Sequence, residues 1–192
     1  MTTRRQLMTL GLHTVFVCGH ASLLRLAHAD VEADAQSQQL RSFLRTPRLV
    51  GQQRLTYWGF DIYDASLWAS SPFAPDAWAK QTLVLKLRYL RDFKGADIAQ
   101  RSIDEMQGQR ALTPAQLKSW SAALQALIPN VRSGESITGV YQPDKGMQLL
   151  HQDRLLGELS DTELAQRFLG IWLAPETSQR QLRQQLLARA QL

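Results

Sequence analysis

The stretch TLVLKLRY, residues 82–89, decides the fold class of this 192-residue chain. Its apolar side chains at Leu83, Leu85, Leu87 and Tyr89 alternate with polar ones at positions 82, 86 and 88. Because successive side chains of a strand point to opposite faces of a sheet, this pattern is typical of a strand with one buried face. The stretch therefore predicts a sheet that is covered on one side and at least partly wet on the other.

A hairpin is predicted before this strand. Residues 49–57 alternate roughly between apolar and polar side chains, Trp58-Gly59 makes a turn, and residues 60–69 are rich in strand formers.

Two helices are predicted after the strand at 82–89. Apolar side chains recur with helical spacing over residues 98–106 and 117–127, and Thr113 with Pro114 is a typical helix start. Pro129 ends the helical pair.

The rest of the chain returns to strands and then to helices. Residues 136–141, 146–150 and 154–159 are short strands joined by tight turns. Ser160 and Glu163 have the spacing of a capping box for a helix that runs through Ile171, and a last helix follows Pro175. Hairpins join the strands in place of strand-helix-strand crossovers. This order predicts an α+β fold, an antiparallel sheet with helices packed on one face.

The N-terminus has the pattern of an export signal. Arg4 and Arg5 precede an apolar run, and Ala27-His28-Ala29 is a small-x-small cleavage site. We therefore divide the chain into a signal peptide (1–29), an N-terminal arm that is frayed or forms a short helix (30–48), and one domain (49–192). A periplasmic or secreted location follows, by the general export route or, given the arginine pair, the twin-arginine route.

Removal of the signal also removes the excess of positive charge. The full chain has a formal net charge of +5, and loss of the signal's three arginines leaves 19 basic residues against 17 acidic ones. A basic patch for nucleic acid is therefore not expected.

The apolar run of the signal is too short for a bilayer-spanning helix, so no integral membrane segment is expected after cleavage.

The residues after position 29 lack several kinds of reactive group. They contain no cysteine, and their only histidine is His151, which excludes disulfides, thiolate nucleophiles and cysteine or multi-histidine metal sites. His151 has two possible interpretations, the base of a Ser-His-Asp triad or an ordinary histidine at the end of a strand. No nucleophile elbow lies near it. Glycines occur singly, without a phosphate loop. We expect no metal, no cofactor and no catalytic residue.

Several segments, in this order, resemble the chalcone-isomerase-like family, and in particular its small exported bacterial branch. The matching pieces are LVGQQR at 49–54, FDIYDASLW at 60–68, YLRD at 89–92, GESI at 134–137 and FLGIWL at 168–173. The resemblance implies an open-faced β-sandwich with a ligand cleft between the sheet and the helices. Some members of this family are isomerases that close a flavanone ring, and others bind fatty acids without catalysis.

The resemblance implies Arg54 and Tyr63 as ligand-binding residues. Arg54 matches an arginine that both kinds of member use, and Tyr63 stands where the fatty-acid binders have a tyrosine. The tyrosine and asparagine that the enzymes use after the first helix are missing from MQGQRAL at 106–112, and Arg167 replaces a further hydroxyl residue. An arginine fork and a phenol would hold a carboxylate, provided that both side chains project to the helix-covered face.

Alternative interpretations of these residues remain open. Arg54 is equally explained as a solvated strand residue paired with Asp61 or Asp64, and Tyr63 as a packed strand aromatic. Three further arginines are interpreted as solvated helix charges, and five tryptophans as core or pocket side chains. The arginines are Arg101, Arg110 and Arg167, and the tryptophans are Trp58, Trp68, Trp78, Trp120 and Trp172.

The sequence thus favours a non-catalytic binder of a small lipophilic molecule, most simply an anionic one such as a fatty acid. The first alternative is an isomerase, or intramolecular lyase, that acts on a small unsaturated substrate with Arg54 stabilising the developing charge. The second is a protein-interaction module that uses the exposed sheet face. Oligomeric state and ligand identity stay open.

Overall fold

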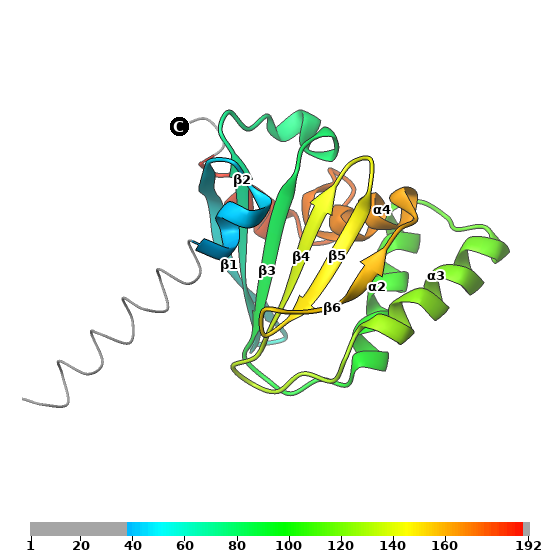
Figure 1. Cartoon of the computed structure of the whole chain (residues 1–192). Helices are drawn as coiled ribbons and strands as arrows, with labels where there is room; N and C mark the ends of the chain where they lie inside the picture. The colour runs from blue at the N-terminus through cyan, green and yellow to red at the C-terminus, as the bar shows by residue number, and fades with distance from the viewer. Residues whose placement is uncertain (1–37, 190–192) are drawn as a thin grey trace, which may run out of the picture. The chain divides into compact units, whose positions relative to one another are not determined.

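The computed structural model describes residues 38–189, and the predicted signal peptide lies outside this range. Six strands and five helical segments follow residues 38–43, which are also helical (Figure 1). In chain order they are β1 (Pro47–Tyr57), β2 (Phe60–Ser70), the 3-10 helix η1 (Pro75–Lys80), β3 (Leu83–Tyr89), α2 (Gly95–Gln109), α3 (Pro114–Leu127), β4 (Ser136–Gln142), β5 (Gly146–His151), β6 (Arg154–Leu159), α4 (Thr162–Leu173) and α5 (Arg180–Leu186).

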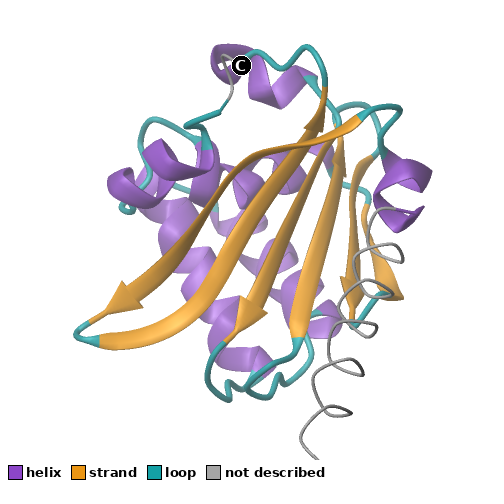
Figure 2. Cartoon of the chain, turned by 90° about the vertical axis from the view of Figure 1, so that its left-hand side faces the viewer, coloured by secondary structure: helices purple, strands orange, loops and turns teal. Residues whose placement is uncertain are grey.

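The six strands form one antiparallel sheet in the order in which they occur in the chain. Each strand pairs with the next, and β3 lies near the centre, where Leu85 is opposite Leu67 of β2 and Gly139 of β4. The helices α2 to α5 cover one face of this sheet, as Figure 2 shows. The predicted α+β fold is therefore confirmed: the alternating residues of TLVLKLRY supply the core on the helix side, with Leu83, Leu85, Leu87 and Tyr89 all buried.

A short helix covers part of the opposite sheet face. Leu40 and Leu44, one helical turn apart, pack against Val84, Val140 and Leu150, and all five side chains are buried. The described part of the N-terminal arm is therefore a short helix, and β1 already begins at Pro47. The sheet face that the interaction-module alternative requires is accordingly not fully open.

The N-termini of α3 and α4 can be compared with the predicted helix starts. At α3, Thr113 is the cap as predicted: its Oγ1 accepts the backbone N–H of Gln116, and Gln116 Oε1 accepts the backbone N–H of Thr113, which completes a capping box that was not predicted. At α4, Ser160 is not the cap. Asp161 caps the helix by accepting the N–H of Leu164 at 3.0 Å. Serine and aspartate are comparably good N-cap residues, so the local sequence does not decide between Ser160 and Asp161. Tertiary contacts therefore select the cap.

Arg167 is not a solvated helix charge. Its Nη2 donates to the backbone carbonyls of Met106 and Arg110 at the C-terminal end of α2, and burial lowers the pKa of its guanidinium. The last carbonyls of a helix lack partners within the helix, and a cation there also opposes the helix dipole. Arg167 therefore ties α4 to the end of α2.

Within residues 38–189, no helix is long and apolar enough to cross a membrane. The same residues bring together no group of three or more histidine, cysteine, aspartate or glutamate side chains that would hold a metal ion.

Candidate functional site

An apolar cavity of about 370 Å³ lies between the sheet and the helices. Its floor consists of residues of β1 to β5, and residues of α2 and α4 border it on the opposite side. Because large apolar side chains of two layers meet here without filling the space between them, the cavity favours an apolar occupant. Its apolar lining includes Leu85, Leu87, Ile98, Ile128, Ile137, Met147, Leu149, Phe168, Leu169 and Ile171.

Two tyrosines bring hydroxyl groups to this apolar space. Tyr63 of β2 and Tyr89 of β3 are directly opposite in the sheet register, their rings are 5.9 Å apart in an edge-to-face arrangement, and both border the cavity. Trp172 Nε1 donates to the Tyr63 hydroxyl at 3.0 Å. Within residues 38–189, neither tyrosine hydroxyl has a hydrogen-bond acceptor for its own proton, so each has an O–H left to donate.

Burial keeps these two phenols neutral. Desolvation raises the pKa of Tyr63 and of Tyr89 far above the usual phenol value. At Tyr63 the charge of Glu105 raises the pKa further, while the Trp172 hydrogen bond and the charge of Arg101 act against it. Both groups therefore remain hydrogen-bond donors throughout the physiological pH range.

The polar side of the cavity comes from α2. Asp97, Arg101 and Glu105 recur every fourth residue, so they lie on one helix face, and all three border the cavity. Arg101 pairs with Glu105, and the Ser102 hydroxyl between them donates to the carbonyl of Ile98 at 2.8 Å. Arg101 is 59% exposed, in agreement with its interpretation as a solvated helix charge, and it also borders the cavity, which the sequence did not predict. The signal was present, since Asp97, Arg101 and Glu105 adjoin the inward-facing Ile98 and Ser102.

Arg54 does not reach the cavity. It extends from the other face of the sheet, 49% of its side chain is exposed, and it pairs with two carboxylates. Its Nε lies 2.7 Å from Asp64 Oδ1 and its Nη1 2.8 Å from Asp61 Oδ2, and these hydrogen bonds, that of Asp64 first, raise the pKa of the guanidinium. The predicted convergence of Arg54 with Tyr63 is therefore wrong, and the alternative pairing with Asp61 and Asp64 is correct.

A β-bulge explains why the two predicted site residues are separated. A regular hairpin around the Trp58-Gly59 turn would place Arg54 opposite Tyr63, on the same face. Thr56 does pair with Asp61, but Leu55 then pairs with Tyr63, which leaves Ile62 as an extra residue and Arg54 opposite Asp64. A shift of one residue moves a side chain to the other face of the sheet. Tyr63 thus borders the cavity and Arg54 does not.

His151 lies away from the cavity. Its Nε2 is 3.0 Å from Glu135 Oε2 at the end of β5, so it is the strand-end histidine of the simpler interpretation. Of the five tryptophans, only Trp172 borders the cavity. Trp78 and Trp120 are buried core residues, and Trp58 is 85% exposed.

Comparisons with known proteins agree with this architecture. An uncharacterized protein of Haemophilus influenzae is 26% identical over 140 residues, which cover 73% of this chain and 67% of that protein. The crystal structure of a fatty-acid binding protein from Arabidopsis thaliana superposes with a TM-score of 0.57 at 10% identity, over 76% of this chain and 88% of the other. At that identity the match concerns the fold. Residues 50–188 match the family model described as chalcone isomerase-like, and the chain therefore belongs to the chalcone isomerase-like family.

Proposed function

We propose that this protein binds a small lipophilic molecule with an oxygenated head group, in the first place a fatty acid, and catalyses no reaction on it. The observation that carries the proposal is the apolar cavity with two neutral phenols whose protons have no acceptor within residues 38–189. An unfilled apolar space of about 370 Å³ lies within the usual range of small-molecule pockets, about 300–1,000 Å³. The structural neighbour from Arabidopsis, a fatty-acid binding protein, supports the same ligand class.

The head group belongs beside Tyr63. A carboxylate that leaves water needs donors for its oxygens, and a hydrogen bond to a charged group contributes about 1.5–3 kcal/mol where water is excluded. Tyr63 and Tyr89 supply two such donors, and Arg101 is the basic side chain among the residues that border the cavity. The alkyl chain then lies against Leu85, Ile137 and the other apolar lining residues.

The isomerase alternative loses the residue on which it depended. It required Arg54 to stabilise charge on a substrate in the cleft, whereas this guanidinium is held by two carboxylates on the opposite face. No observation in residues 38–189 supplies a replacement among the cavity residues other than Arg101, which is already paired with Glu105.

Calorimetric titration with a long-chain fatty acid tests the binding proposal. Tyr63→Phe and Tyr89→Phe should each weaken binding by about 0.5–1.5 kcal/mol, roughly two- to tenfold, because each removes one donor and keeps the ring. Tyr141→Phe is the matched control, since Tyr141 is a buried tyrosine that donates to the Ala79 carbonyl and does not border the cavity. The corresponding fatty alcohol measures what the negative charge adds.

Native mass spectrometry of the protein purified from its own host gives an independent check on the ligand. An acyl chain that co-purifies with the wild type would support the proposal. Absence of any co-purifying lipid, together with no heat of binding for fatty acids of several lengths, would overturn it.

We also propose that the chain is exported and begins at Asp30 after cleavage of residues 1–29. The support is in the sequence: the arginine pair, the apolar run and Ala27-His28-Ala29. N-terminal sequencing of the protein from fractionated cells tests it. An intact N-terminus in the cytoplasmic fraction would rule it out.

A further inference from the structure

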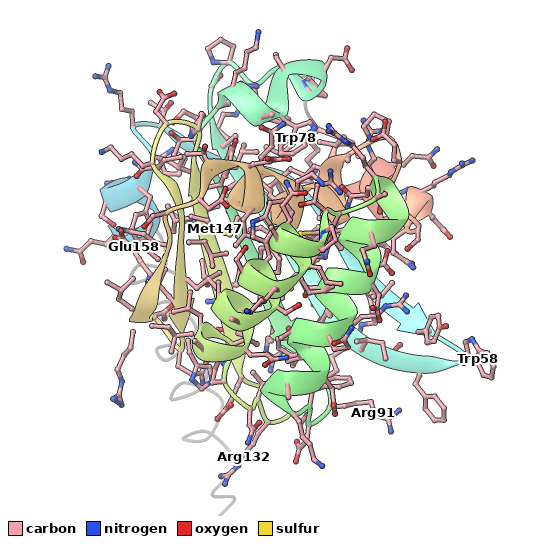
Figure 3. The ribbon with its side chains drawn as sticks, turned by 90° about the vertical axis from the view of Figure 1, so that its right-hand side faces the viewer. Trp58, Trp78, Arg91, Arg132, Met147 and Glu158 are labelled. Atoms are coloured by element: carbon pink, nitrogen blue, oxygen red, sulfur yellow. The ribbon has the colours of Figure 1, made fainter. Side chains whose placement is uncertain are left out.

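The tip of the β1–β2 hairpin carries three large aromatic side chains that the fold does not bury. Tyr57, Trp58 and Phe60 are 49%, 85% and 57% exposed, and they make up three of the five exposed large apolar residues in residues 38–189. Trp58 and Gly59 both have positive φ, at 51° and 78°, which fixes a tight two-residue turn. We call these residues, 57–60, the aromatic tip. Figure 3 shows Trp58 at the far end of the projecting hairpin.

Two arginines accompany the rings. The guanidinium of Arg91 lies 4.5 Å from the centre of the Phe60 ring, and that of Arg101 lies 5.9 Å from the centre of the Tyr57 ring. Arg91 forms no ion pair with any residue in the range 38–189. Figure 3 places Arg91 on the same side of the molecule as Trp58. Exposed rings with guanidinium groups beside them offer an apolar surface next to donors for phosphate.

The aromatic tip is continuous with the entrance of the cavity. Tyr57 belongs to the tip and also borders the cavity. Ile62 and Arg101, which lie outside the tip, border the cavity as well. Whatever binds the tip therefore lies next to the polar side of the cavity.

We propose that the aromatic tip docks this protein on the surface of a phospholipid bilayer that contains anionic lipid. Tryptophan and tyrosine prefer the region between head groups and acyl chains, and arginines near them pair with lipid phosphates. A protein partner is disfavoured by area. The exposed parts of the three rings amount to about 400 Å², about half of what one partner buries in a standard interface. Insertion into a bilayer has no such requirement.

This docking can be tested independently of the proposed ligand, because Trp58, Phe60 and Arg91 do not border the cavity. Its consequence for a lipid binder is direct: the entrance beside Tyr57 would face the bilayer, so that an apolar ligand would pass between membrane and cavity without crossing bulk water.

The test uses the full-length chain and vesicles of phosphatidylglycerol and phosphatidylcholine with brominated acyl chains. Bromine quenches tryptophan fluorescence at short range, so the wild type should show a quenched component that is missing in Trp58→Phe. Trp58→Ser/Phe60→Ser should lower the partition coefficient by about tenfold or more, because two large apolar side chains no longer enter the lipid. Arg91→Gln should lower it about fivefold on these vesicles and little on vesicles of brominated phosphatidylcholine alone.

Matched controls use exposed residues outside the tip. Leu117→Ser removes an exposed apolar side chain from α3, and Arg110→Gln removes an exposed arginine at the end of α2. Both should bind vesicles like the wild type. Every variant carries the same residues 1–37, so differences between variants report on the substituted positions. Equal partitioning of wild type and Trp58→Ser/Phe60→Ser, or an unquenched Trp58 on bound vesicles, would overturn the proposal and leave a protein partner as the occupant of the tip.

Discussion

Tyr63 is held in place by three neighbours from three different elements. Leu55 of β1 and Tyr89 of β3 lie opposite it in the sheet, and Trp172 of α4 donates to its hydroxyl. The tryptophan N–H occupies one lone pair of the phenol oxygen and leaves the phenol proton to point elsewhere. A buried hydroxyl with an unused proton is costly unless another group accepts it, and an oxygen of the proposed ligand would be such an acceptor.

The first prediction at this scale concerns Arg54. Arg54→Met should leave fatty-acid affinity within about twofold of the wild type, because a side chain on the other sheet face contributes no hydrogen bond to a ligand in the cavity. The same calorimetric titration should show the loss expected for Tyr63→Phe. A tenfold loss of affinity in Arg54→Met would mean that the hairpin register differs when ligand is bound.

The second prediction concerns Glu135 and pH. The hydrogen bond from the Arg132 N–H, followed by that with His151, lowers the pKa of the Glu135 carboxyl. A carboxyl whose folded pKa lies below its unfolded value stabilises the protein above the unfolded pKa, and this stability is lost as pH falls through the folded pKa. Glu135→Gln should therefore be less stable than the wild type at neutral pH, and the difference should begin to shrink as pH falls below the usual glutamate pKa of about 4.3 and vanish below the lowered pKa of the folded state. Urea unfolding at a series of pH values measures this, and a difference that persists at low pH would contradict it.

At the scale of elements, strands and helix caps were predictable to the extent that local pattern determines them. The alternation in β3 and the start of α3 at Thr113-Pro114 are such cases, because one buried face or one cap decides the conformation. The bulge at Ile62 was not predictable, because the sequence does not show whether an isoleucine in a strand is paired or bulged. This one extra residue moved Arg54 away from the site. The sequence left open whether the arm is frayed or forms a short helix, because Leu40 and Leu44 gain their apolar partners only when β3, β4 and β5 are assembled.

The prediction at this scale separates the two candidate caps of α4. Asp161 accepts the N–H of Leu164 with one oxygen and Trp120 Nε1 with the other, at 3.0 Å and 2.9 Å. Asp161→Ala should lower the free energy of unfolding by about 2–4 kcal/mol, since it removes a helix cap and leaves a buried indole N–H without its acceptor. Ser160→Ala, the adjacent control, should change it by less than about 0.5 kcal/mol. Denaturant unfolding of both variants decides between the positions, and a larger effect at Ser160 would restore it as the cap.

At the scale of the whole molecule, the cavity is a property of how two layers meet. The sequence predicted the layers, and the family resemblance implied a cleft between them, but neither specified which side chains border it. Gly139 illustrates why. It lies in the centre of β4 and borders the cavity, and a Cβ there would be 3.0 Å from Met147 Sδ, 3.5 Å from Met147 Cε and 3.8 Å from Leu149 Cδ2. A side chain at this position would therefore compete with Met147 for the space above the sheet.

The last prediction fills that space. Gly139→Leu should direct an isobutyl group toward the cavity, once the flexible end of Met147 shifts by a few tenths of an ångström to make room for the Cβ. Stability should stay the same or rise by up to about 1 kcal/mol, because glycine in a strand interior is unfavourable and the added carbons fill an apolar void. Fatty-acid affinity should fall at least about tenfold, since the volume that holds the chain is occupied.

Gly108→Leu is the control for Gly139→Leu. It adds the same side chain to the exposed side of α2, where a Cβ meets no atom within 4 Å, and it should leave both stability and affinity close to the wild-type values. Calorimetry and thermal unfolding of the two variants together distinguish a filled cavity from a damaged fold. If Gly139→Leu unfolds like the wild type and still binds with full affinity, the ligand lies outside the cavity between the sheet and the helices, and the phenols of Tyr63 and Tyr89 do not hold its head group.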